Sequence, residues 1–202
     1  MYSLPIQQLI KAFSHLPGVG PRTAERFVFH LLKSGKKEAA ELTVALKHLI
    51  ERVKSCELCW DFSDQNPCVR CADKTRDRTR ICAVSEPQHM VTLDRTGEYR
   101  GLYHILRGHI TPDEDEPLRG LKISELLDRI KKDETVSEVI LALNPDVAGE
   151  TTMMFLEKNI GELRPDLLVT RLARGLPMGS DLQYADDITL GSAIRHRLSM
   201  KT

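Results

Sequence analysis

A chain of 202 residues, 41% hydrophobic and 29% charged, can bury one core, or one core with small appended modules. Its apolar runs fall short of the roughly 20 residues that a membrane helix needs. The N-terminus has neither a basic segment nor a small-residue cleavage site, which argues against secretion. We therefore expect a cytoplasmic protein whose five cysteines are thiols or metal ligands rather than disulfides.

The 29 basic and 29 acidic residues cancel, but they are unevenly distributed along the chain. Residues 1–55 carry nine Lys/Arg and four Asp/Glu, a balance of +5. Residues 56–80 carry five of each, and residues 81–202 carry fifteen basic and twenty acidic groups, a balance of −5. The N-terminal segment is therefore the part suited to attract phosphate, although a solvated lysine-rich helical surface would show the same surplus.

The first 55 residues predict three helical runs. Apolar residues follow one helical face over 6–13 and again over 38–53, and a third run spans 23–32. The first and third of these runs are separated by Leu16-Pro17-Gly18-Val19-Gly20-Pro21. Two glycines two residues apart let the backbone turn tightly and bring bare N–H groups close to a partner, and the proline suits the first position of a helix.

Arg22 and Arg26 lie one turn apart on the helix that follows these glycines, at an N-terminus that favours an anion. This pattern is typical of a helix–hairpin–helix, which holds the phosphate backbone without recognising bases. The alternative is an ordinary αα-hairpin whose glycines only make the turn. We predict that Gly18, Gly20, Arg22 and Arg26 bind DNA.

Four cysteines form the strongest signal in the sequence. Cys56-x2-Cys59-x8-Cys68-x2-Cys71 supplies two thiolate pairs at the spacing of one tetrahedral ion. Buried core cysteines would sit among apolar residues, whereas these sit among charged and polar ones, and a redox motif needs one pair rather than two. We predict a structural Zn²⁺, one per chain, because four protein ligands leave no open position. Cys82, inside an apolar run, is expected to be a core thiol.

From residue 81 onward, short apolar strands alternate with helical segments. The predicted strands are 81–84, 102–106, 139–143 and 167–170, and the predicted helices are 88–93, 123–130 and 151–160. This alternation indicates βαβ units in a mostly parallel sheet with helices on both faces. An acidic exposed loop is expected at 113–117, and an amphipathic stretch at 187–198.

Acidic residues follow two of these strands. Glu86 comes after the first strand, and Asp146 and Glu150 come after the third, where open α/β sheets build their sites. Such a cluster can hold Mg²⁺ for phosphoryl chemistry, or it can be a polar loop whose acids begin helices. The sequence contains no GxxxxGK[ST] phosphate loop, which argues against a P-loop ATPase.

In their order along nearly the whole chain, these motifs resemble the bacterial recombination-mediator family RecR. The resemblance rests on Leu16-Pro17-Gly18-Val19-Gly20, the four cysteines and the run Arg95-Thr96-Gly97-Glu98-Tyr99-x-Gly101-x-Tyr103-His104-Ile105-Leu106. It continues through Asn144-Pro145-x3-Gly149-Glu150 and Gly175-Leu176-Pro177-x-Gly179-x-Asp181-Leu182-x-Tyr184-Ala185-Asp186.

The resemblance implies a multi-module α/β protein of four parts. These are a helix–hairpin–helix arm (1–54), a four-cysteine zinc finger (55–78), a Toprim-like α/β domain (79–173) and a C-terminal helical segment (174–202). It further implies a homo-tetrameric ring that binds double- and single-stranded DNA and acts with RecO and RecF to load recombinase, associated with the nucleoid. Glu150 resembles a position that contacts RecO.

The sequence departs from the family at the sheet edge. Ser85 stands where the family usually has Glu or Gln, and Ala148 stands where it usually has Glu. Because Mg²⁺ needs several oxygen ligands, we predict no catalytic metal and a non-enzymatic role. The rival hypothesis is a Mg²⁺-dependent Toprim nuclease or topoisomerase-like enzyme that uses Glu86, Asp146 and Glu150.

Overall fold

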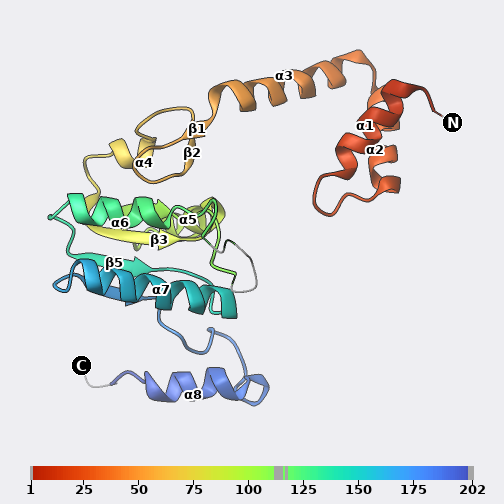
Figure 1. The fold of residues 1–202 in the computed structure, drawn as a ribbon. Helices are drawn as coiled ribbons and strands as arrows, with labels where there is room; N and C mark the ends of the chain where they lie inside the picture. The colour runs from red at the N-terminus through yellow and green to blue at the C-terminus, as the bar shows by residue number, and fades with distance from the viewer. Residues whose placement is uncertain (1, 112–115, 117, 200–202) are drawn as a thin grey trace. The chain divides into compact units, whose positions relative to one another are not determined.

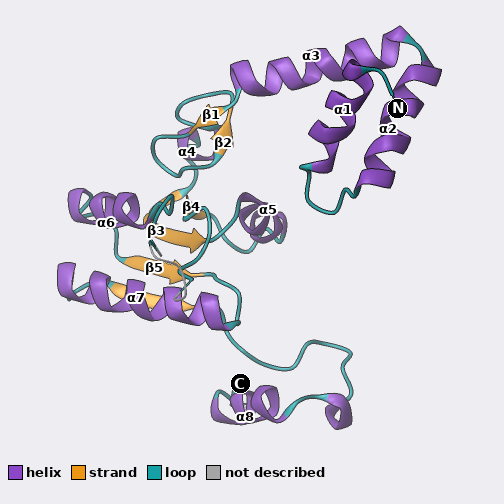
Figure 2. Ribbon diagram, turned by 45° about the vertical axis from the view of Figure 1, so that its right-hand side comes forward, coloured by secondary structure: helices purple, strands orange, loops and turns teal. Residues whose placement is uncertain are grey.

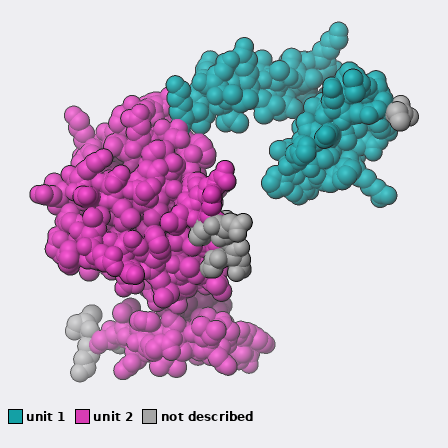
Figure 3. Space-filling view, in the orientation of Figure 1, with its two compact units in different colours: residues 1–54 teal, residues 55–202 magenta. Residues whose placement is uncertain are grey.

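A computed structural model describes residues 2–111, 116 and 118–199, so the acidic loop expected at 113–117 falls, apart from Glu116, outside the described residues. The chain divides into two compact units, Met1–Lys54 and Ser55–Thr202 (Figure 3). Among the described residues, no helix is both long enough and apolar enough to cross a membrane.

The first unit consists of three helices, as predicted: α1 (Leu4–Ser14), α2 (Pro21–Ser34) and α3 (Lys36–Arg52). The helices α1 and α2 pack side by side (Figure 2), because Ala24 and Val28 of α2 are fully buried and the rings of Phe13 and Phe27 meet edge to face at 5.9 Å. In contrast, α3 has no buried residue, so its apolar face is exposed within this chain.

The second unit begins with the cysteine module. A two-stranded sheet pairs β1 (Lys54–Ser55) with β2 (Phe62–Ser63), and a short helix, α4 (Val69–Ala72), follows. Cys68 is the N-cap residue of α4. Apart from the four cysteines and Asp61, no described residue of 55–73 is buried, so hydrophobic packing contributes little to holding this module together.

A four-stranded sheet in the order β4-β3-β5-β6 forms the body of the second unit (Figure 1). All three strand pairings are parallel. The strands are β3 (Asp77–Val84), β4 (Gly101–Ile105), β5 (Glu138–Leu141) and β6 (Leu168–Arg171). They lie where the four apolar runs predict them. The strand β3 begins four residues before its run, because Asp77 still pairs with β4 and Arg80 still pairs with β5.

Helices cover both faces of this sheet, as predicted. One core cluster joins alternate sheet residues to α6 (Ile123–Lys132) and α7 (Val147–Leu163), with Leu126 and Leu156 fully buried. The second cluster, on the opposite face, packs Met90 of α5 (Pro87–Arg95) against Val84 and Ile105. The alternation of the two clusters along β3 follows from the period of two in a strand.

The C-terminal segment holds a single turn, η1 (Leu182–Tyr184), and a helix, α8 (Asp187–Arg195). The amphipathic stretch extends to residue 198, but the helix ends at Arg195. His196 is the C-cap residue, and its φ of −104° and ψ of 24° leave the helical conformation. Its backbone N–H and its ring Nδ1 lie 3.0 and 2.9 Å from the Ser192 carbonyl.

Candidate functional sites

The four predicted metal ligands come together in the structure. All four cysteine side chains are at least 96% buried, and their Sγ atoms lie within 4.8 Å of one another. Each Cys-x2-Cys pair lies on its own tight turn: Trp60 N–H donates to the Cys56 carbonyl at 2.9 Å, and Ala72 N–H donates to the Cys68 carbonyl at 2.9 Å. Four sulfur ligands at this spacing fit one tetrahedral ion.

The thiols of the cluster interact with one another. Cys59 and Cys68 share a hydrogen bond of 3.6 Å between their sulfur atoms, which raises the pKa of the Cys59 thiol and lowers that of the Cys68 thiol. The Cys68 backbone N–H also points at the Cys56 sulfur, at 3.4 Å. Cys82 lies apart, buried in β3, and burial raises its pKa to about 12. It is a core thiol, as expected.

The first turn of the cysteine module is fastened to the α/β body through three consecutive backbone carbonyls, those of Leu58, Cys59 and Trp60. Arg129 Nη1 donates to the first at 3.0 Å, the Ile105 N–H to the second at 2.8 Å, and Arg107 Nε to the third at 3.1 Å. Arg129 also donates to the Tyr103 carbonyl at 2.9 Å, so its guanidinium joins the module, α6 and β4.

Trp60 and Arg107, which share one of these hydrogen bonds, are the two non-glycine residues with positive φ in the described ranges, at 64° and 62°. Such backbone costs energy and persists only where surrounding contacts hold it. Here Lys122 Nζ lies 4.1 Å from the centre of the Trp60 ring, and the Arg107 guanidinium lies 4.1 Å from the centre of the Phe62 ring. Cation–π contacts therefore support the docked turn.

The predicted hairpin lies between α1 and α2. Gly18 has φ +77°, a conformation that other residues rarely adopt, and Gly20 is the N-cap residue of α2, with Pro21 at its first position. A Cβ atom added at either glycine would meet nothing within 4 Å, so the backbone on this side is open to a partner. Arg22 and Arg26 are exposed, and neither has an acidic partner among the described residues.

The structure does not bring the acidic residues at the sheet edge into one metal-binding group. The Asp146 carboxylate accepts the Gly149 N–H at 2.7 Å and so begins α7. Ser85, buried at the end of β3, lies 3.0 Å from His89 Nδ1. The four cysteines are the single group of three or more metal-ligating side chains found within the described ranges.

Glu150 lies on the first turn of α7 and forms ion pairs with two arginines, one that ends β6 and one that follows it. Arg171 Nη1 is 3.2 Å from one carboxylate oxygen, and Arg174 contacts the other. Gly149 allows the close approach of α7 to the preceding loop, because a Cβ there would lie 2.0 Å from the Asn144 carbonyl oxygen. The carboxylate of Glu150 is thus balanced by guanidinium groups.

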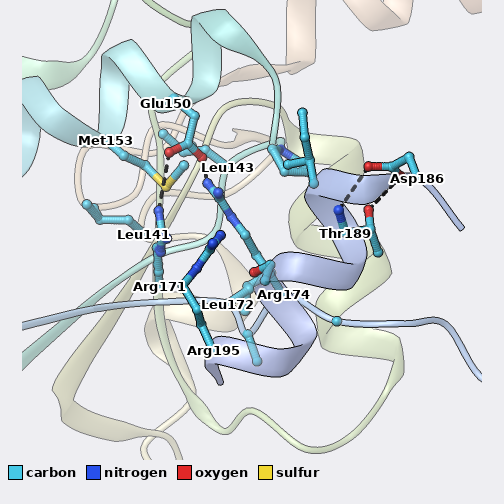
Figure 4. Close-up of a pocket in the computed structure, with 15 residues that line it drawn as sticks. Leu141, Leu143, Glu150, Met153, Arg171, Leu172, Arg174, Asp186, Thr189 and Arg195 are labelled. Carbon is cyan, nitrogen blue, oxygen red and sulfur yellow. Dashed lines mark hydrogen bonds and ion pairs between the residues drawn. The ribbon is translucent and has the colours of Figure 1, made fainter. Parts of the chain in front are cut away.

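A cavity of about 550 Å³ lies beside this ion pair, between the carboxyl ends of β5 and β6 and helix α8 (Figure 4). Arg171, Arg174 and Arg195 line it together with Glu150. Sequence reasoning singled out none of these arginines, nor Arg107 and Arg129 at the cysteine module. Their positions become informative only when the fold brings distant segments together, although Arg174 directly precedes the glycine that opens the C-terminal motif.

Family models match three parts of the chain. A model described as "RecR, helix-hairpin-helix" matches residues 6–50, one described as "Toprim domain" matches 79–173, and one described as "RecR, C-terminal" matches 175–197. The fold and these matches together define a Toprim-type α/β protein that carries a helix–hairpin–helix and a four-cysteine module.

Full-length relatives show the same relationship. The chain is 46% identical to "Recombination protein RecR" of Bifidobacterium adolescentis, over 97% of this chain and 96% of the relative. It is 45% identical to the proteins of that name from Cutibacterium acnes (98% and 97% covered) and Moorella thermoacetica (98% of each covered). The chain belongs to the RecR family.

We predict that the cysteine cluster binds one Zn²⁺ per chain and that the fold of 55–78 depends on it. Cys68→Ser should bring the zinc content well below one ion per chain and make residues 55–78 sensitive to protease, because metal binding is part of folding in such modules. Elemental analysis and limited proteolysis measure both effects. Cys82→Ala, the control, should keep one ion. A zinc-free wild-type protein of unchanged stability would contradict the prediction.

Proposed function

We propose that the protein is a non-enzymatic DNA-binding recombination mediator. It would act in the cytoplasm, at the nucleoid, with RecO and RecF to help load recombinase onto single-stranded or gapped DNA. The names of its relatives and the helix–hairpin–helix match support this role. The observation that carries it is the hairpin itself, where two exposed arginines stand beside an open glycine turn at a helix N-terminus.

The proposed contact is with phosphates rather than bases. Gly18 and Gly20 leave the backbone accessible, and Arg22 and Arg26 add two positive charges that no acidic group of the chain neutralises within the described residues. Phosphate contacts carry no sequence information directly, so binding to double- and single-stranded DNA should be independent of sequence. We propose that residues 1–54 bind DNA, that 55–78 hold structural zinc and that 79–173 contact partner proteins. Residues 174–202 form the C-terminal segment.

Replacing Arg22 and Arg26 by Glu should weaken binding to both kinds of DNA and reduce the salt dependence. Each lost phosphate contact lowers the slope of log K against log salt by about 0.9 for duplex DNA and about 0.7 for single strands. Fluorescence anisotropy at several salt concentrations measures both quantities. The double change of Lys36 and Lys37 to Glu alters the net charge of the same unit equally and should have a much smaller effect. Equal losses for the two variants would show that net charge, not the hairpin, determines binding.

We also propose that the protein assembles into a homo-tetrameric ring. The helix α3 supports assembly, because one of its faces presents apolar side chains to solvent: Leu42, Leu46, Leu49 and Ile50 are 38%, 50%, 58% and 80% exposed. A contiguous apolar surface of this kind marks an interface.

Leu46→Glu should reduce the mass of the assembly, because it places a charge within the apolar face of α3. Light scattering coupled to size-exclusion chromatography measures that mass. His48→Glu introduces a carboxylate two residues further along, on the other side of the helix, and should leave the mass unchanged. A tetramer that survives Leu46→Glu would place the contact elsewhere.

Glu150 is the proposed contact for RecO. Its carboxylate is already paired with Arg171 and Arg174, so a partner would meet a charged cluster rather than a free acid. The same pairing argues against the rival enzyme, which needs Glu150 as a Mg²⁺ ligand with Glu86 and Asp146.

The rival predicts that purified protein nicks supercoiled plasmid in the presence of Mg²⁺. We expect no nicking above the level of a mock preparation, because two of the three proposed ligands, Asp146 and Glu150, are engaged in a helix cap and in ion pairs. Agarose electrophoresis of the plasmid after incubation with Mg²⁺ measures it. Nicking that disappears in Asp146→Ala would establish the enzyme and overturn the mediator proposal.

A further inference from the structure

The cavity at the carboxyl ends of β5 and β6 combines an apolar wall with a cationic mouth. Its volume of about 550 Å³ lies within the range of small-molecule sites in proteins. Apolar side chains from the sheet, α7 and α8 contribute one part of the lining: Leu141, Leu143, Met153 and Ile188. Three arginines that reach it from three segments contribute the other (Figure 4): Arg171, Arg174 and Arg195.

Positive charge exceeds negative charge in this cavity. Of the two acidic residues in the lining, Asp186 is the N-cap residue of α8, where its carboxylate accepts the Thr189 N–H at 2.9 Å and the Thr189 hydroxyl at 2.7 Å. Glu150 alone faces the arginines, and it pairs with two of them. Arg195 has no acidic partner among the described residues, so its guanidinium is available to a ligand.

Guanidinium groups select a particular ligand chemistry. Their planar arrangement of N–H donors matches phosphate and carboxylate oxygens, and they repel a divalent cation. In open α/β sheets, this place beyond the carboxyl ends of the strands is where ligands bind. The edge therefore has the charge of a site that holds phosphate directly, whereas a magnesium-dependent site would hold it through the metal.

We propose that this cavity is a metal-independent binding site for a nucleotide-sized phosphate ester. Arg171, Arg174 and Arg195 bind the phosphate, and the apolar wall contacts the rest of the ligand. The Glu150 carboxylate occupies two of these guanidinium groups until phosphate displaces it. This site is separate from the hairpin and does not depend on DNA binding there.

Isothermal titration with ATP and with inorganic pyrophosphate, in buffer free of Mg²⁺, tests the proposal. Both should bind, and ATP should bind more tightly because its nucleoside can contact the apolar wall, whereas pyrophosphate has no such group. Arg195→Gln should weaken both about tenfold or more, the typical effect of losing one charge-assisted hydrogen bond. Arg197→Gln removes the same charge two residues away, outside the lining, and should bind as the wild type does.

Glu150→Gln gives the most specific result. Removing the competing carboxylate should tighten binding of both probes, an effect opposite to that of a damaged fold. Weaker binding in this variant would show that Glu150 supports the ligand and does not compete with it, and binding that requires Mg²⁺ would show a metal-dependent site. Either result would overturn the proposal. Binding unaffected by Arg195→Gln would also overturn it. So would binding that is confined to a single-stranded oligonucleotide and lost in the Arg22/Arg26 variant, because the phosphate would then be held at the hairpin.

Discussion

The position of the cysteine module on the α/β body depends on the hydrogen bonds that Ile105, Arg107 and Arg129 donate to the first cysteine turn. A module with so few buried side chains gains little from hydrophobic burial, so hydrogen bonds to its backbone contribute more to its attachment. Here Ile105 supplies a backbone donor, and Arg107 and Arg129 supply charged ones, which form stronger hydrogen bonds than neutral groups. The four clustered cysteines, which fit one tetrahedral ion, lie inside the module, and these donors join it to the sheet.

This arrangement gives Arg129 a further role. Arg129 donates its hydrogen bonds to backbone carbonyls. Burial lowers the pKa of its guanidinium, and the nearby Cys71 and Cys59 thiols partly offset this by raising it. A cation without a carboxylate partner is costly to desolvate. A divalent ion held by four thiolates would carry net negative charge, which the Arg129 guanidinium would offset. Metal binding would then be coupled to docking of the module.

At the carboxyl ends of β5 and β6, the sheet has the architecture of an open α/β site but not the charge of an acidic, metal-binding one. Parallel strands still end beside the start of α7, but the serine and alanine at 85 and 148 leave few carboxylates there. Asp146 caps a helix and Glu150 is paired with arginines. The charge of this part of the sheet is thus set by arginines at the end of β6, in the segment that follows it, and on α8.

The sequence by itself determined the features whose physical cause is local. Spacing specified the cysteine cluster, because two residues between cysteines place both sulfurs on one turn, and periodicity located the helices and the parallel strands. Gly18 and Gly20 identified the hairpin, because two glycines so close together indicate a tight turn, and Gly18 has the positive φ that such a turn requires.

The tertiary structure decided which distant groups meet. Arg107 and Arg129 reach the carbonyls that follow Cys56 only after β4 and α6 pack together, and Arg195 joins Arg171 only because α8 lies across the sheet's edge. A single arginine forms no repeating pattern in the sequence from which its partner could be predicted. Its partner depends on packing between segments many residues apart, and the spacing of residues along the chain carries no record of that.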